Sequence, residues 1–137
     1  MLSNHSFTTD DGIQCRMIFC VDHVLDLPSS LNMSEPRYYG VGSSSVSSGT
    51  YISESTGQTV YAVHFFRYVP ESSQELFVMS TDQRLAQYNN EQVDALIDQC
   101  CRMVSISSPV PPKHEPLRRE DYDDVIAQLL FGYDETK

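Results

Sequence analysis

The chain has 137 residues, the length of a single domain that can bury a core, and 40% of them are apolar. Leu, Ile, Val and Phe make up about a quarter of the chain, which is above the range of disordered chains. It has 9 basic and 19 acidic residues, a net charge of −10. This charge argues against direct binding to nucleic acids or anionic membranes, because both are bound through Lys and Arg. It favours a protein partner with a basic surface, and the plainer alternative is that it keeps the domain soluble.

We expect no targeting signal in this chain. The N-terminal stretch MLSNHSFTTDD has no apolar core of a signal peptide, and no segment approaches the roughly 18 apolar residues of a membrane span. Four cysteines are too few for a disulfide scaffold. We therefore expect a cytoplasmic protein with reduced thiols.

Residues 13–27 alternate between apolar and polar side chains, the pattern of a long β-strand with Cys15, Phe19 and Val21 in the core. The segment also contains Cys20 and His23, two residue types that commonly bind metal ions. In a strand, however, Cys20 and His23 lie on opposite faces, and the Cα atoms of Cys15 and His23 are roughly 26 Å apart. Zinc ligands must all lie about 2 Å from the ion, so no metal or other cofactor is predicted here.

Further strand signals follow closely along the chain. Tyr38 and Tyr39 start an extended run that passes into a Gly/Ser-rich stretch, and residues 59–69 (TVYAVHFFRYV) give the strongest β pattern. Apolar residues occupy both odd and even positions of 59–69, which predicts a central strand covered on both sides. Another strand follows at 75–79, and the short spacings favour an antiparallel meander.

The periodicity becomes helical in the second half. Apolar residues from Val93 to Val104 recur on one helix face, and Asn89 or Asn90 can cap a helix over about 90–105. Ser80 to Asp82 either caps an earlier turn through Tyr88 or begins another strand. A Pro-rich link spans 106–116, and a last amphipathic helix is predicted at about 118–132.

Together these elements predict a single α+β domain over residues 1–137. An antiparallel meander sheet of four or five strands lies within 13–80, and two C-terminal helices pack on one face. Because two helices do not cover both faces of the 59–69 strand, we expect a homodimer.

Several residues are candidates for binding or chemistry. His64 lies in the middle of the central strand, and a ligand groove is predicted around it. The groove would be lined by His64, Tyr61, Tyr68, Tyr38, Tyr39 and His23. A Cys–His pair there would be the minimal nucleophile arrangement, and a packed core histidine is the alternative.

Two other sites are indicated by charge. Cys101 is the candidate reactive thiol, because the adjacent Arg102 favours a thiolate, and a packed thiol is the alternative. The acidic first turns of the last helix form a candidate partner-binding face, for which a solvated helix face is the alternative; its residues are Glu120, Asp121, Asp123 and Asp124.

Three classes of function follow from these features. We place first a small acidic interaction domain that binds a basic partner surface, as an adaptor, a dedicated chaperone or an inhibitor or immunity-type protein. A small-ligand-binding domain with the Tyr/His-lined groove is second, and a Cys/His-dependent hydrolase or transferase is third. We therefore expect a non-enzymatic function without a cofactor.

Overall fold

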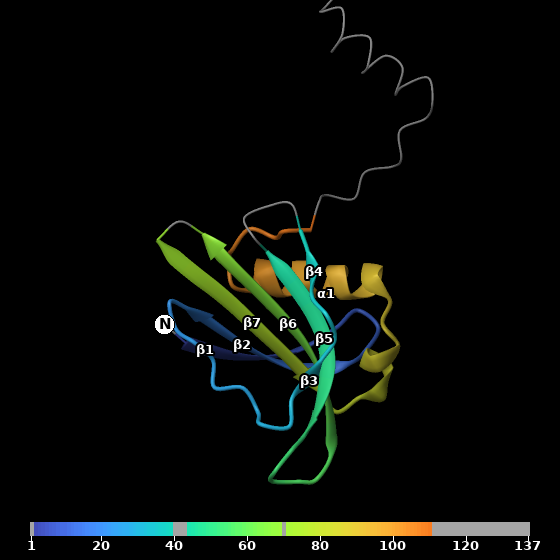
Figure 1. Ribbon diagram of the computed structural model, residues 1–137. Helices are drawn as coiled ribbons and strands as arrows, with labels where there is room; N and C mark the ends of the chain where they lie inside the picture. Colours follow the sequence, from blue (N-terminus) through green and yellow to red (C-terminus); the bar gives the residue numbers. More distant parts are fainter. Residues whose placement is uncertain (1, 40–43, 70, 111–137) are drawn as a thin grey trace, which may run out of the picture.

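The computed structural model describes residues 2–39, 44–69 and 71–110 of the chain. The elements in chain order are β1 (Leu2–Thr8), β2 (Gln14–Val21), β3 (Asn32–Met33), β4 (Arg37–Tyr38), β5 (Ser45–Ile52), β6 (Thr59–Val69), β7 (Ser72–Ser80), the 3-10 helix η1 (Gln83–Gln87) and α1 (Asn90–Met103). All strand pairs are antiparallel, and the sheet order is β1-β2-β7-β6-β5-β3, with β4 also paired to β5 (Figure 1). An antiparallel sheet with a helix against it agrees with the expected α+β class.

The sheet differs from the expectation in size and connectivity. Within the described residues it has seven strands rather than four or five. β1 and β3 were not anticipated, and the extended run predicted from Tyr38 is divided into β4 and β5. It is also more than a meander, since β2 pairs with β7 across a long stretch of sequence. The second predicted helix, at about 118–132, lies outside the described residues, as do positions 111–116 of the Pro-rich link.

The first predicted strand is shorter than expected. β2 ends at Val21 instead of continuing to residue 27. Asp22 has φ of 60°, in the left-handed region that strands do not use, so the chain leaves the sheet at this point. Alternation in the sequence continues past this turn, which is why the pattern alone did not show the end.

Strand β6 is confirmed as a central strand with the predicted bounds, and it lies between β7 and β5. Val63 and Phe65 are buried on one of its faces, and Val60 and Ala62 are buried on the other. Burying such side chains contributes roughly 1.5–3 kcal/mol each for the larger ones. The strand is therefore apolar at both odd and even positions because both of its faces are covered.

Helix α1 is confirmed close to its predicted bounds. Asn89 caps it: its side chain accepts a hydrogen bond from the Gln92 N–H, and the Gln92 side chain bonds back to the Asn89 N–H. The buried side of the helix carries Val93, Leu96, Ile97, Cys100 and Cys101. Within the described parts of the chain, no helix is long and apolar enough to cross a membrane.

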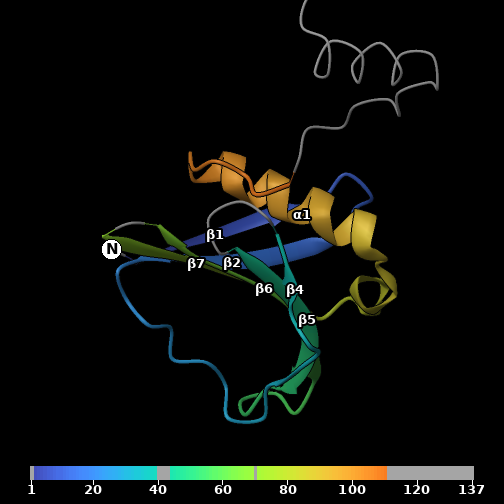
Figure 2. The ribbon, with the colours of Figure 1, turned by 45° about the horizontal axis from the view of Figure 1, so that its top comes forward.

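The two faces of the sheet are covered by different kinds of structure (Figure 2). Helix α1 packs on one of them, here called the helix face, and the main core lies there around Met17, Phe65 and Leu76. The chain between β2 and β3 crosses the opposite face, here called the crossover face, because these two strands lie far apart in the sheet order. Residues 22–31 form this crossover segment.

Candidate functional site

A groove of about 1180 Å³ lies beside α1. It is bordered by the turn between β1 and β2, by α1 itself and by the chain that follows the helix. Its lining residues are Thr9, Asp10, Asp11, Tyr88, Glu91, Gln92, Asp94, Ala95, Leu96, Asp98, Gln99, Arg102, Ser108 and Val110. Five of these side chains are carboxylates and one is an arginine. We call it the α1 groove.

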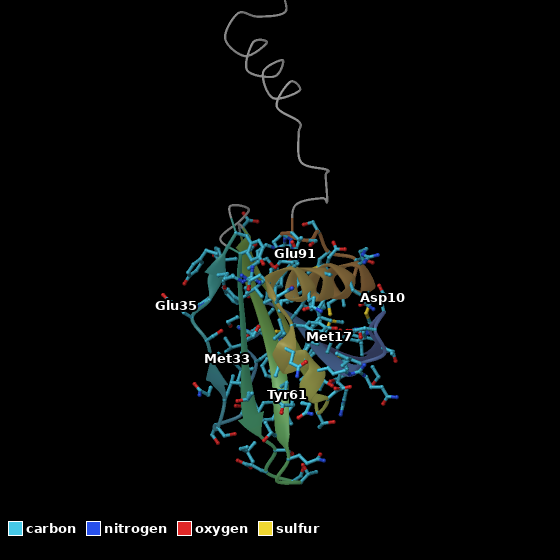
Figure 3. All side chains as sticks on the ribbon, turned by 90° about the vertical axis from the view of Figure 1, so that its right-hand side faces the viewer. Asp10, Met17, Met33, Glu35, Tyr61 and Glu91 are labelled. Carbon is cyan, nitrogen blue, oxygen red and sulfur yellow. The ribbon has the colours of Figure 1, made fainter. Side chains whose placement is uncertain are left out.

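The local sequence explains why the carboxylates meet. Glu91, Asp94 and Asp98 follow one another at spacings of three and four residues, so they form one stripe along the helix. Asp10 comes from the tight β1–β2 turn, where Gly12 adopts φ of 88°. Figure 3 shows Asp10 and Glu91 on the side of the molecule that carries α1, with Met17 between the helix and the sheet.

Asp94 and Asp11 hold the walls of the α1 groove in place. The Asp94 carboxylate accepts a hydrogen bond from Arg37 at 3.0 Å and another from the Tyr39 hydroxyl, which ties β4 to the helix. The Tyr88 hydroxyl bonds to both oxygens of Asp11 at 2.9 Å. Hydrogen bonds from Thr9 and Tyr88 lower the pKa of Asp11, so its carboxylate is charged at neutral pH.

The other three carboxylates are more available. Asp98 forms an ion pair with Arg102 at 3.1 Å, one turn along α1, and such exposed helix pairs are weak. Asp10 and Glu91 are exposed, and neither takes part in a side-chain hydrogen bond or ion pair within the described residues. The groove therefore presents negative charge that its own structure leaves uncompensated.

The sequence analysis placed the acidic binding face elsewhere. Its residues, Glu120, Asp121, Asp123 and Asp124, lie outside the described residues. The signal for the α1 groove was present in the spacing of Glu91, Asp94 and Asp98, but the contribution of Asp10 depends on a contact across about 80 residues of sequence. Only the fold brings that turn to the helix.

The crossover face holds a second polar cluster, centred on Glu75. This carboxylate is only 7% exposed, yet it is bonded through both oxygens. His64 Nε2 lies 2.6 Å from Oε2, and Oε1 accepts the Leu25 N–H at 3.4 Å and the Cys20 thiol at 3.8 Å. Glu75 thus orients the His64 ring and fastens the crossover segment to β7.

The thiols are poorly suited to nucleophilic chemistry. Burial and the neighbouring Glu75 raise the pKa of Cys20, and burial raises the pKa of Cys15 to about 11 and that of Cys101 to about 12. All four cysteines are free and buried. A thiol of this kind stays protonated at neutral pH, so the structure gives no support to Cys101 as a reactive thiol.

The residues predicted to line one ligand groove are divided between the two faces. His64, Tyr38 and Tyr68 share the crossover face, and both tyrosines are largely exposed. Tyr61 and Tyr39 belong to the helix face, where Tyr39 bonds to Asp94.

His23 is exposed in the crossover segment and approaches the His64 site through its backbone carbonyl, which accepts the Cys20 thiol at 3.3 Å. Among residues 2–39, 44–69 and 71–110, no three His, Cys, Asp or Glu side chains converge to hold a metal ion.

Comparison with known proteins gives no assignment. No family model, no curated protein and no solved structure matches this chain. The functional argument therefore depends on the geometry of the groove and of the two sheet faces.

Proposed function

We propose that this chain is a small acidic interaction domain that binds a basic segment of a partner protein in the α1 groove. The observation that supports it is the gathering of five carboxylates and one arginine around a single groove, from two segments far apart in the sequence. Adaptor, dedicated chaperone and inhibitor or immunity-type roles are all compatible with this mode of binding.

The α1 groove suits Lys and Arg side chains in particular. Asp10 and Glu91 offer carboxylates to cationic groups, and Ala95 and Val110 offer apolar surface to the methylene stems of those side chains. Electrostatic attraction of this kind speeds association and weakens as salt is added, since the Debye length falls to about 8 Å at physiological ionic strength.

Two further elements of the proposal concern assembly and location. A homodimer would cover the exposed Tyr38 and Tyr68 of the crossover face. A cytoplasmic location fits four free cysteines, because reducing compartments keep thiols unpaired.

The proposal is tested with a fluorescein-labelled octalysine peptide and fluorescence anisotropy in 50 mM NaCl. The triple variant Asp10→Asn, Glu91→Gln, Asp98→Asn removes three charges from the α1 groove. We expect it to weaken binding by about tenfold or more, because close charge pairs dominate the attraction. The matched control Glu35→Gln, Glu54→Gln, Glu71→Gln removes three charges elsewhere and should change binding by about twofold or less.

An equal loss in both triple variants would show that the peptide responds to net charge alone. That result would overturn the α1 groove as the binding site. Binding that is unchanged in the groove variant would overturn it as well.

The two alternative functions have less support. The residues predicted for a Tyr/His-lined groove are split between the faces, and the cysteines available to a hydrolase or transferase are buried and protonated. The His64–Glu75 pair is the feature that favours the catalytic alternative, because a carboxylate that orients a histidine is a common part of such sites.

A further inference from the structure

A second concave site lies on the crossover face and is separate from the α1 groove. It has a volume of about 520 Å³, within the range of small-molecule pockets. Its lining residues are Ser6, Phe7, Thr8, Gln14, Cys15, Arg16, Tyr51, Val60, Met79, Ser80 and Thr81. We call it the Arg16 pocket.

Strand register divides the Arg16 pocket into a polar and an apolar half. Arg16 on β2 is paired with Ser6 on one side and with Met79 on the other. Gln14 and Thr8 form the next pair towards the end of the sheet. The β1 and β2 side therefore carries a cation and neutral hydrogen-bonding groups.

Apolar side chains face this polar half from the neighbouring strands. Met79, Val60 and Tyr51 come from β7, β6 and β5. The Tyr51 hydroxyl bonds to the Met79 sulfur at 3.6 Å, which fixes the two side chains against each other. Burial raises the pKa of Tyr51, and the nearby charge of Arg16 partly offsets that rise, so the cation acts on the apolar half of the pocket.

Arg16 differs from the other arginines. Arg37, Arg84 and Arg102 each form an ion pair with an aspartate, and Arg67 bonds to Gln74. Arg16 is exposed and is the one arginine of the described residues that forms neither an ion pair nor a side-chain hydrogen bond. In a chain of net charge −10, an arginine left without a carboxylate beside a concave apolar surface is a recognition feature.

We infer that the Arg16 pocket binds a small organic carboxylate with an apolar body. The guanidinium of Arg16 pairs with the carboxylate in the two-bond geometry that arginine favours, and the hydroxyls of Ser6 and Thr8 are placed to complete its hydrogen bonds. The apolar body lies against Met79, Val60 and Tyr51. One cation among neutral donors matches a single negative charge, which favours a monocarboxylate over a polyphosphate.

The probes that test this inference are octanoate and 4-phenylbutyrate, each compared with its neutral amide by isothermal titration calorimetry. Inorganic phosphate serves as an anion without an apolar body. We expect both carboxylates to bind, their amides to bind about tenfold more weakly or worse, and phosphate not to bind, because both halves of the pocket are needed.

Variants then assign the binding to Arg16. Arg16→Gln should weaken carboxylate binding by about tenfold and leave the amides unchanged, whereas Arg16→Lys should restore part of the affinity. Arg37→Gln removes the same charge from β4, at the far edge of the sheet, and should bind both carboxylates like the wild type. Amide chemical shifts of Ser6 and Arg16 should move on titration.

Failure of both carboxylates to bind saturably would overturn the inference. Unchanged affinity in Arg16→Gln, or shifts confined to α1, would overturn it too. The octalysine experiment does not involve Arg16, so this inference and the proposed function can each fail alone.

Discussion

The two faces of the sheet show how one strand can serve two purposes. On the helix face, β6 contributes Val63 and Phe65 to the apolar core under α1. On the crossover face, the same strand contributes His64 and the partly exposed Phe66, beside a buried carboxylate. The helix face is packed mainly with apolar side chains, and its buried Arg67 is bonded to Gln74 and Ser107. The irregular crossover segment, in contrast, brings backbone N–H groups that need acceptors. The polar cluster on the crossover face follows from that need.

Alanine substitution of two neighbouring phenylalanines on β6 should give the largest difference in the free energy of unfolding between the two faces. Phe65→Ala removes a ring with no solvent exposure and should lower the free energy of unfolding by about 3–5 kcal/mol. Phe66→Ala removes a partly exposed ring, and we expect a loss of about 1 kcal/mol. Urea unfolding followed by circular dichroism measures both. Equal losses would mean that the crossover face is packed as tightly as the helix face.

A substitution in the polar cluster of the crossover face should have a smaller effect on the free energy of unfolding. His64→Leu removes the donor that lies 2.6 Å from the Glu75 carboxylate and leaves that oxygen buried without it. We expect a loss of roughly 1–3 kcal/mol in the free energy of unfolding, the usual cost of an unsatisfied buried polar group. Ser47→Ala, which changes the residue paired with His64 on β5, is the control and should cost about 0.5 kcal/mol or less. Wild-type stability in His64→Leu would show that the pair contributes nothing.

The smallest expected effect concerns the rim of the helix face, where Asp11 joins the β1–β2 turn to Tyr88. The folded-state pKa of Asp11 is lowered, so its contribution to stability is present above its unfolded pKa of about 3.8 and is lost as the pH falls through the folded value. Asp11→Asn should therefore cost roughly 0.5 kcal/mol at pH 6, because the site is exposed and screened.

That difference between the wild type and Asp11→Asn should be smaller at pH 2.5, which is below the unfolded pKa of about 3.8. Urea midpoints of the two proteins at both pH values test the prediction. A difference that persists undiminished at pH 2.5 would rule out the carboxylate charge as its source.

Elements with a regular pattern of apolar residues over many positions were predicted well. The cap at Asn89 and the helix that follows it were recognisable from local pattern, and so was the two-sided strand β6. Two features were missed because they depend on distant partners. β1 is polar at both odd and even positions and forms a strand because β2 pairs with it, and β3 and β4 are two residues each.

The candidate sites depend on contacts that the sequence pattern does not show. The alternation of side chains along β6 places Tyr61 and His64 on opposite faces, so the groove predicted from the sequence includes residues of both faces. The partner of His64 was not foreseen, since Glu75 is one carboxylate among 19 acidic residues and nothing local marks it as buried. The sequence likewise did not distinguish Arg16 from any other exposed arginine.

The sequence by itself determined the strands that carry a clear apolar pattern, where the helix begins and which side of that helix is apolar, because these properties depend on residues a few positions apart. The tertiary structure alone decided which charges meet. It brought Asp10 to the α1 stripe, set Glu75 under His64 and left Arg16 without a carboxylate. Sheet order and register fix those distances, and a crossover between distant strands leaves no local signal in the chain.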